Sequence, residues 1–171
     1  MHLLKVLDLP FGKFRDKGVP IDNLSNYSSS EEDMVFISSL GALKDQRLLF
    51  ITRQAMIKLV DGAEFDVSKR TTAATKLGAE DELLGVIPAA ETDTLVMQSE
   101  KNMFLRISVG EIPQKKKAAI GVRGMKLSAG DLLSTYYCLG ENEARVIEVK
   151  EKEVHLNRLH VAGRDTKGVK K

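Results

Sequence analysis

This 171-residue sequence has one cysteine, few aromatic residues and no long apolar run. Its single cysteine, Cys138, cannot form an internal disulfide, and we expect a buried thiol in a reducing compartment. Tryptophan is absent and aromatic residues make up 5% of the chain, which argues against stacking on the bases of RNA or single-stranded DNA. No apolar run reaches the length of a membrane span and no secretory signal opens the sequence, so we expect no membrane partner.

Sequence motifs of catalysis and metal binding are also missing. The chain has no G-x-S-x-G motif, and residues 121–124 lack the lysine and hydroxyl residue of a phosphate-binding P-loop. Tyr136 and Tyr137 lie in an expected strand without an evident base or metal partner, so we interpret them as packing residues. No histidine has cysteines or carboxylates at the spacing of a metal site; the three are His2, His155 and His160. We therefore expect no catalytic site, no metal and no cofactor in this chain.

The sequence consists largely of short apolar segments rich in Val, Ile, Leu and Phe, which turn-forming glycines separate. Helical periodicity is not sustained over any long window, which favours an all-β fold. The pattern repeats about every fifty residues, as expected for a propeller-like array of small antiparallel sheets, or blades. We predict a single domain over residues 1–171, an array of about three to four partly complete four-stranded blades.

The division of the chain into repeats leaves its two ends incomplete. We place repeats at approximately 2–40 (partial), 46–89, 94–139 and 144–171 (partial). The two partial repeats could complete one another in a closed ring, since lone halves leave unpaired strand edges. The other interpretation, which we favour, is that the chain is a piece of a longer array.

Positive charge recurs at one phase of the repeat, in glycine-marked loops. The net charge is only +2 with a pI near 8.6, but basic residues concentrate in these loops while acidic residues cluster elsewhere. Lysine and arginine neutralise backbone phosphates whatever the base sequence, so we predict contacts with duplex DNA. The candidate residues are Lys13, Arg15, Lys17, Lys69, Arg70, Lys76, Lys115, Lys116, Lys117, Arg123, Lys126, Arg164 and Lys167.

Two alternatives accompany this prediction. A lysine run is often no more than a solvated loop. Four basic residues of the expected strands recur at a similar phase and are either further contacts or ordinary outward-facing positions: Lys5, Lys58, Arg106 and Arg158. The same fold could also serve as a protein–protein interaction module, which would favour exposed aromatic or apolar anchors over lysine loops.

Several stretches resemble a known family. Residues 102–108, 111–113, 121–127 (GVRGMKL) and 130–131 resemble one blade of the C-terminal domain of the A subunit of bacterial type IIA DNA topoisomerases, namely DNA gyrase and topoisomerase IV. Residues 52–58 with 80–86 are similar to the preceding blade, and residues 17–24 resemble an earlier one. The resemblance covers nearly the whole chain.

This resemblance implies a β-pinwheel, a disc of four-stranded blades whose basic rim binds and bends or wraps duplex DNA. Such a domain is non-catalytic and supports the ATP-dependent change of DNA topology by the holoenzyme. The implied partners are duplex DNA, the ATPase B subunit, and the rest of the topoisomerase A subunit. ATP and magnesium are implied for the holoenzyme only, and the implied location is the bacterial cytoplasm, associated with the nucleoid.

One departure from the family bears on the parent enzyme. Gyrase carries a box rich in glutamine, arginine and glycine in its first blade, and no such sequence occurs here; residues 114–119 (QKKKAA) are at most a distant echo. Either the blade that bears the box lies outside this chain, or the parent is similar to topoisomerase IV. The second interpretation is the one we favour.

Overall fold

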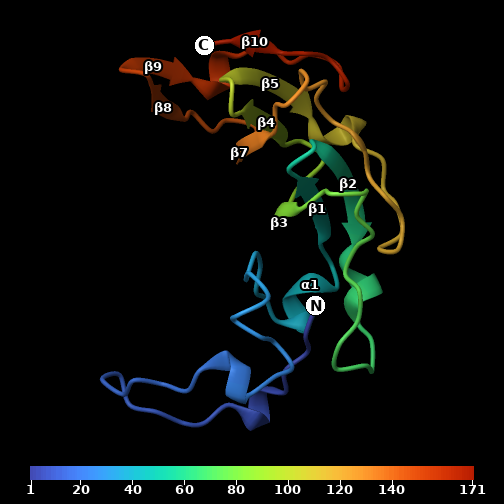
Figure 1. Cartoon of the computed structure of the whole chain (residues 1–171), viewed down its shortest axis with the longest axis vertical. Helices are drawn as coiled ribbons and strands as arrows, with labels where there is room; N and C mark the ends of the chain where they lie inside the picture. The colour runs from blue at the N-terminus through green and yellow to red at the C-terminus, as the bar shows by residue number, and fades with distance from the viewer.

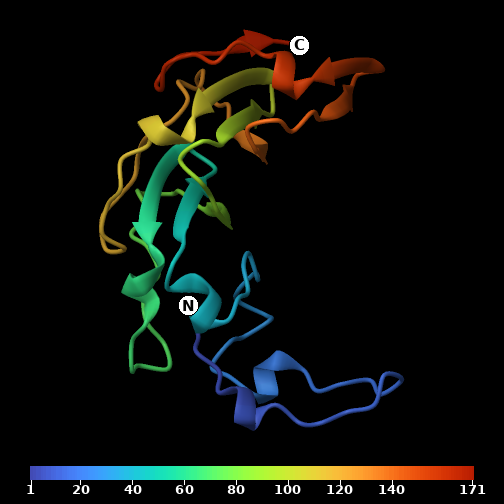
Figure 2. The ribbon, with the colours of Figure 1, turned by 180° about the vertical axis from the view of Figure 1, so that it is seen from behind.

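Sheets of antiparallel strands follow one another along an open arc (Figures 1 and 2). The structure is a computed structural model that describes all 171 residues. Two four-stranded sheets form the middle of the arc, and a two-stranded hairpin follows them toward the C-terminus. We call the two larger sheets the first and the second blade. The expected all-β architecture is thereby confirmed at the level of its sheets.

The first blade has the strand order β3-β1-β2-β6. Its strands are β1 (Arg47–Thr52), β2 (Met56–Asp61), β3 (Leu83–Pro88) and β6 (Val122–Arg123). β1 pairs with β2 and β3, and β2 pairs with β6 through Met56 opposite Arg123. The outermost strand therefore comes from the following repeat, so this sheet is completed by residues more than sixty positions away.

The second blade repeats this arrangement in the order β10-β5-β4-β7. Its strands are β4 (Thr94–Ser99), β5 (Met103–Ser108), β7 (Leu133–Leu139) and β10 (Val169–Lys170). The outermost strand again comes from the following repeat, with Val169 opposite Phe104. The remaining hairpin, β8 (Val146–Val149) and β9 (Lys152–His155), turns through Lys150 and Glu151, both with positive φ, as a tight two-residue hairpin requires.

The structural period is 47 residues in the hairpin part of the repeat. A short 3₁₀ helix follows each hairpin, and the three helices η3 (Gly62–Phe65), η4 (Val109–Glu111) and η5 (Leu156–Arg158) begin 47 residues apart. The hairpin turns match as well. The Met56 N–H donates to Thr52 Oγ1 at 3.1 Å, and the Met103 N–H donates to Ser99 Oγ at 3.3 Å. This fixed period allows residues of different repeats to be compared position by position.

Buried carboxylates fasten the loop after each hairpin to its turn. Asp81 Oδ1 accepts a hydrogen bond from the Gln54 N–H at 2.9 Å, and Asp131 Oδ1 accepts one from the Lys101 N–H at 3.2 Å. Gln54 and Lys101 hold the same place in their turns, 47 residues apart. The recurring acidic residue before the closing strand is thus a structural contact in both blades.

Three apolar clusters lie between successive layers of the arc. The largest joins the facing sides of the two blades, with Leu49, Ile57, Leu95 and Leu105 among its buried members. The second cluster packs the far side of the second blade on β8, β9 and η5, and the third packs the far side of the first blade on α1 (Leu40–Leu43) and η3. Because both faces of each hairpin are buried, its strands read as nearly continuous apolar runs.

Residues before β1 form no strand. They contain the 3₁₀ helices η1 (Val6–Asp8) and η2 (Ile21–Asn23) and the short helix α1. The strands that we expect within the partial repeat 2–40 therefore do not form. The physical reason is pairing: in the blades the closing strand pairs with the first strand of its own hairpin, and no such strand precedes residues 33–37 in this chain. None of the helices has the length and apolarity needed to cross a membrane.

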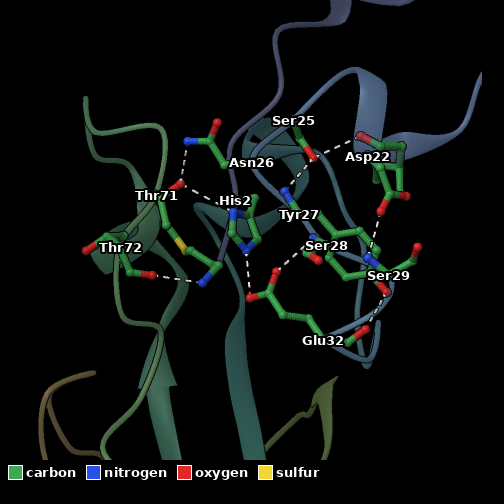
Figure 3. A network of polar contacts seen from close by, with 12 residues as sticks. His2, Asp22, Ser25, Asn26, Tyr27, Ser28, Ser29, Glu32, Thr71 and Thr72 are labelled. Carbon is green, nitrogen blue, oxygen red and sulfur yellow. Dashed lines mark hydrogen bonds and ion pairs between the residues drawn. The ribbon is translucent and has the colours of Figure 1, made fainter.

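A polar network attaches this N-terminal segment to the loop after η3 (Figure 3). His2 lies between Glu32 Oε1, at 3.0 Å from Nε2, and Thr71 Oγ1, at 3.3 Å from Nδ1. The Asn26 side-chain amide also donates to Thr71 Oγ1, at 3.0 Å. The hydrogen bond to His2 lowers the pKa of the Glu32 carboxyl. This network sets the N-terminal segment against the residues that directly follow Lys69 and Arg70.

Candidate nucleic-acid interface

Three basic loops lie along the convex edge of the arc. Rim loop 1 (residues 66–82) runs from η3 to β3, rim loop 2 (112–121) from η4 to β6, and rim loop 3 (159–168) from η5 to β10. Figures 1 and 2 show them as the green, gold and red loops on the outer side of the sheets. All three leave the blade just after a 3₁₀ helix, which explains why positive charge at one phase of the sequence gathers on one edge.

Rim loops 2 and 3 run beside the preceding hairpin in the same register. Gln114 bridges to Leu59 in the first blade and Val161 bridges to Arg106 in the second, both in parallel orientation. A shift by the 47-residue period superposes the basic positions of the loops. Arg70, Lys117 and Arg164 fall at one position, and Lys76, Arg123 and Lys170 fall at another.

Lys58 lies beneath rim loop 2 and is only 2% exposed. Its Nζ donates to the carbonyl oxygens of Lys117 at 2.8 Å and Ala119 at 2.7 Å, with a longer contact to Lys116 O at 3.4 Å. The ammonium group also lies 5.3 Å from the centre of the Phe50 ring. Burial lowers the pKa of Lys58 to about 8. Neither alternative for this strand lysine describes it, because the side chain is neither outward-facing nor open to a phosphate: it is buried, and its ammonium group donates to carbonyl oxygens of the loop.

Glu64 of η3 holds the lysine run of rim loop 2 from the other side. The Lys117 N–H donates to Glu64 Oε2 at 2.9 Å, and Lys117 Nζ donates to the Glu64 carbonyl oxygen at 2.8 Å. Lys116 Nζ lies 3.5 Å from Glu64 Oε1, yet its side chain is 86% exposed. Lys115 is half-buried. Among the three lysines, Lys116 therefore extends farthest into solvent.

Arg123 of β6 is paired with Asp165 of rim loop 3. Its Nη2 donates to Asp165 Oδ2 at 2.9 Å, and its Nε donates to Oδ1 of the same carboxylate. This bond lowers the pKa of Asp165 and raises that of Arg123. Arg164 adds a hydrogen bond from Nη1 to the Arg123 carbonyl oxygen at 3.1 Å. The sequence offers both partners but no sign that they meet, since they lie in different repeats.

A hollow of about 440 Å³ opens between β5 and rim loop 3. No carboxylate side chain lines it. Its basic and imidazole side chains are those of Arg106, Arg158, His160, Lys167 and Lys171. Arg106 is fixed there by hydrogen bonds from Nη1 to the carbonyl oxygens of Asn157 at 2.5 Å and Leu159 at 3.3 Å. Leu105 occupies the position that Lys58 has in the first blade. Sequence reasoning did not find this hollow, because it arises from the shape of a loop.

The remaining candidates divide between the rim and the N-terminal segment. Lys69, Arg70 and Lys76 are exposed on rim loop 1, where the Leu3 N–H donates to the Arg70 carbonyl oxygen at 2.7 Å. Lys126 is exposed just after β6. The other three are exposed on the blue loop of Figure 1, which projects from the opposite side of the arc: Lys13, Arg15 and Lys17. The structure thus gathers ten of the thirteen candidates along the rim and leaves these three apart from it.

Comparison with known sequences agrees with this architecture. The sequence profile of the family described as "DNA gyrase C-terminal domain, beta-propeller" matches residues 46–90 and 93–135. The DNA gyrase A protein of Lawsonia intracellularis is 30% identical over 145 residues, which are 84% of this chain and 18% of that protein. The corresponding DNA topoisomerase 4 protein of Streptococcus pneumoniae is 26% identical over 129 residues, 72% of this chain and 16% of that protein. The chain spans less than a fifth of the length of these relatives.

Solved structures share the fold. The C-terminal domain of DNA topoisomerase IV superposes with a TM-score of 0.83 at 21% identity, covering 96% of this chain and 53% of that one. The C-terminal domain of DNA gyrase A gives a TM-score of 0.71 at 19% identity, covering 91% and 53%.

The blades, with an outer strand supplied by the next repeat and basic loops on one edge, are those of a β-pinwheel domain. The chain belongs to the family of DNA gyrase C-terminal domains, which includes relatives in both gyrase and topoisomerase IV A subunits.

Proposed function

We propose that this chain binds duplex DNA through its phosphate backbone along the three rim loops, and bends the duplex around the convex edge. The observation that carries the proposal is the common location of these loops, because a row of cations on a curved edge attracts a duplex at several successive phosphates. The low aromatic content and the absence of a stacking platform on the loops favour backbone contact over base readout.

In this proposal the chain supplies DNA binding to the A subunit of a type II topoisomerase. It contributes no catalytic group, metal or cofactor of its own. Strand cleavage belongs to other domains of the A subunit, and ATP hydrolysis with magnesium belongs to the B subunit. The holoenzyme acts on the nucleoid in the bacterial cytoplasm. Support comes from the family to which the chain belongs.

The test compares charge removal on the rim with charge removal elsewhere. The rim variant replaces one exposed lysine in each loop by alanine: Lys69, Lys116 and Lys167. The control variant replaces Lys150 and Lys152 of the β8–β9 hairpin, which points away from the rim (Figure 1). Fluorescence anisotropy with labelled duplexes of unrelated sequence should show weaker binding of the rim variant on all of them and little change for the control. Equal losses in the two variants would place the interface elsewhere.

Bending is measured separately. A short duplex with a donor and an acceptor dye at its two ends should show increased energy transfer on binding the wild-type chain. The rim variant, at a concentration that gives equal occupancy, should bend the duplex less, because fewer phosphates are held along the arc. If the chain binds the duplex without any change in energy transfer, it binds DNA but does not bend it.

A protein-interaction role has one observation in its favour, and it concerns the N-terminal segment. Leu7, Phe11 and Phe14 are almost fully exposed there. Exposed aromatic side chains are typical anchors of protein interfaces. If this second function holds, replacing Phe11 and Phe14 by serine should abolish association of the chain with itself or with the rest of the topoisomerase, measured by light scattering, and should leave DNA affinity unchanged.

A further inference from the structure

Lys58 is a buried cation without a carboxylate partner. It stands opposite Phe50 in the β1–β2 pair, and its side chain turns away from the strand toward rim loop 2. Moving an ammonium group out of water costs free energy that hydrogen bonds of good geometry must offset. An ammonium group has three donors, and the Lys58 Nζ directs all three at carbonyl oxygens of one short loop. All the hydrogen bonds of the buried ammonium group therefore go to rim loop 2.

These bonds determine how the loop faces solvent. The carbonyl oxygens of Lys116, Lys117 and Ala119 converge on one inner point. With its carbonyls turned inward, the loop presents the Lys116 side chain outward, where it is 86% exposed. The loop carries three consecutive positive charges that repel one another, and the bonds from Lys58 and to Glu64 restrain it.

The second blade shows the same loop position without this lysine. Leu105 replaces Lys58 there, and the space under rim loop 3 is the hollow of about 440 Å³. Residues 163–166 of rim loop 3 correspond to residues 116–119, and no cationic side chain donates to their carbonyl oxygens. The comparison shows that the strand tolerates an apolar residue at this place. The blade fold is therefore compatible with an apolar residue here, and the hydrogen bonds of Lys58 go to rim loop 2.

We propose that Lys58 is a positioning residue, whose ammonium group holds rim loop 2 in the conformation that presents its lysines to a phosphate backbone. The proposal rests on the proposed function, since it assigns the way in which that function's most basic loop is organised. It also makes the loop sensitive to pH, because a neutral amine has only two N–H donors and binds carbonyls more weakly.

The charged surroundings of Lys58 determine the pH at which this occurs. Burial is the largest effect and lowers its pKa to about 8, Glu64 of η3 raises it, and Lys115 of the loop lowers it. Lys76 and Asp81 of rim loop 1 line a small gap beside β2 together with Lys58. Ordinary surface lysines stay charged well above pH 8. As the pH rises past about 8, Lys58 therefore loses its proton.

Limited proteolysis tests the proposal without DNA. Trypsin cuts after Lys115, Lys116 and Lys117 in rim loop 2 and after Lys69 and Arg70 in rim loop 1, so the second set is an internal control in the same molecule. In Lys58→Met, cleavage in rim loop 2 should accelerate about tenfold relative to rim loop 1, as expected when charged hydrogen bonds that restrain a loop are removed. Lys58→Arg, which keeps the cation, should recover part of the protection. An unchanged ratio in Lys58→Met would overturn the proposal.

Two further readouts accompany this ratio. In the wild-type chain the ratio of cleavage in the two loops should rise between about pH 7 and about pH 9.5, whereas in Lys58→Met it should stay constant. This ratio cancels the pH dependence of trypsin itself, and a flat wild-type ratio contradicts the proposal even if a variant folds poorly. Duplex affinity at neutral pH should fall in Lys58→Met and recover in Lys58→Arg. If the wild-type chain binds no duplex at all, the proposed function fails, while the proteolysis ratios still decide the role of Lys58.

Discussion

Lys58, Asp81 and Asp131 are buried ionisable side chains and Arg106 is a half-buried one, and backbone groups hydrogen-bond to all four. The two cationic side chains donate to carbonyl oxygens of the following repeat. The two carboxylates accept from amide groups of a hairpin turn. A buried polar group is tolerated when it is hydrogen-bonded, and here each of these bonds joins a loop to the sheet. These residues thereby attach loops to the sheets and their turns.

Cys138 gives a prediction at the same scale. Burial raises the pKa of its thiol to about 12, and the nearby Asp93 carboxylate contributes to this rise. Because the thiolate is the reactive species, alkylation of the folded chain by iodoacetamide at mildly alkaline pH should be at least about a hundredfold slower than alkylation of the chain unfolded in urea. Mass spectrometry of the single cysteine follows both reactions. Similar rates in the two states would show that the thiol is accessible and ionises normally.

At the scale of elements, the two blades meet closely where β3 and β7 approach one another. Gly85 of β3 lies against the Tyr136 ring of β7, and a Cβ atom at Gly85 would come within 2.6 Å of the ring carbon Cζ. Burial raises the pKa of the Tyr136 hydroxyl. The expectation that Tyr136 is a packing residue agrees with this contact. Glycine is needed here for the close approach of the two strands.

Replacing Gly85 by alanine should therefore destabilise the chain by about 1–3 kcal/mol, since the added methyl group displaces the tyrosine ring from a packed interface. Urea unfolding measures the change. Gly41→Ala is the matched control, because a Cβ atom there meets no neighbour within 4 Å, and alanine in a helix should be neutral or slightly stabilising. Equal effects of the two substitutions would mean that the contact between β3 and β7 is not rigid.

Elements also show where sequence reasoning succeeds and where it fails. The hairpins around residues 46–59 and 94–106 are predictable, because their apolar segments are long enough for a strand signal and both faces are buried. β6 and β10 have two residues each, which is too short for any periodicity, and they pair with a sheet of the previous repeat. Residues 2–40 contain apolar runs that suggest strands, but the chain offers them no partner strand.

At the scale of the whole molecule, each blade takes its outermost strand from the following repeat. Neither repeat therefore supplies all four strands of its own sheet. Removing residues 164–171 would take β10 from the second blade, and removing residues 112–126 would take β6 from the first. Stability in such an array depends on contacts between neighbouring repeats. The expected β-pinwheel is confirmed, and the resemblance to gyrase and topoisomerase IV A subunits is confirmed as well.

The candidate interface was partly predictable for a related reason. Basic residues recurring at one phase must share one side of an array, so the rim loops follow from the sequence. Which lysines point outward does not follow from it. Lys58 is buried under a loop and Arg123 is paired with Asp165 of another repeat, and both contacts join positions more than forty residues apart. The DNA contacts of the individual residues stay predictions.

The salt dependence of duplex binding tests the central claim most directly. Binding along the rim should release counterions, so the logarithm of the association constant should fall linearly with the logarithm of salt concentration, with a slope of roughly −0.9 for each phosphate bound. The wild-type chain should show a slope that corresponds to at least about three phosphates, and the variant without Lys69, Lys116 and Lys167 should have a flatter slope by roughly 0.9 for each phosphate it no longer binds. A slope near zero, or one that these three substitutions leave unchanged, would contradict a DNA-binding rim.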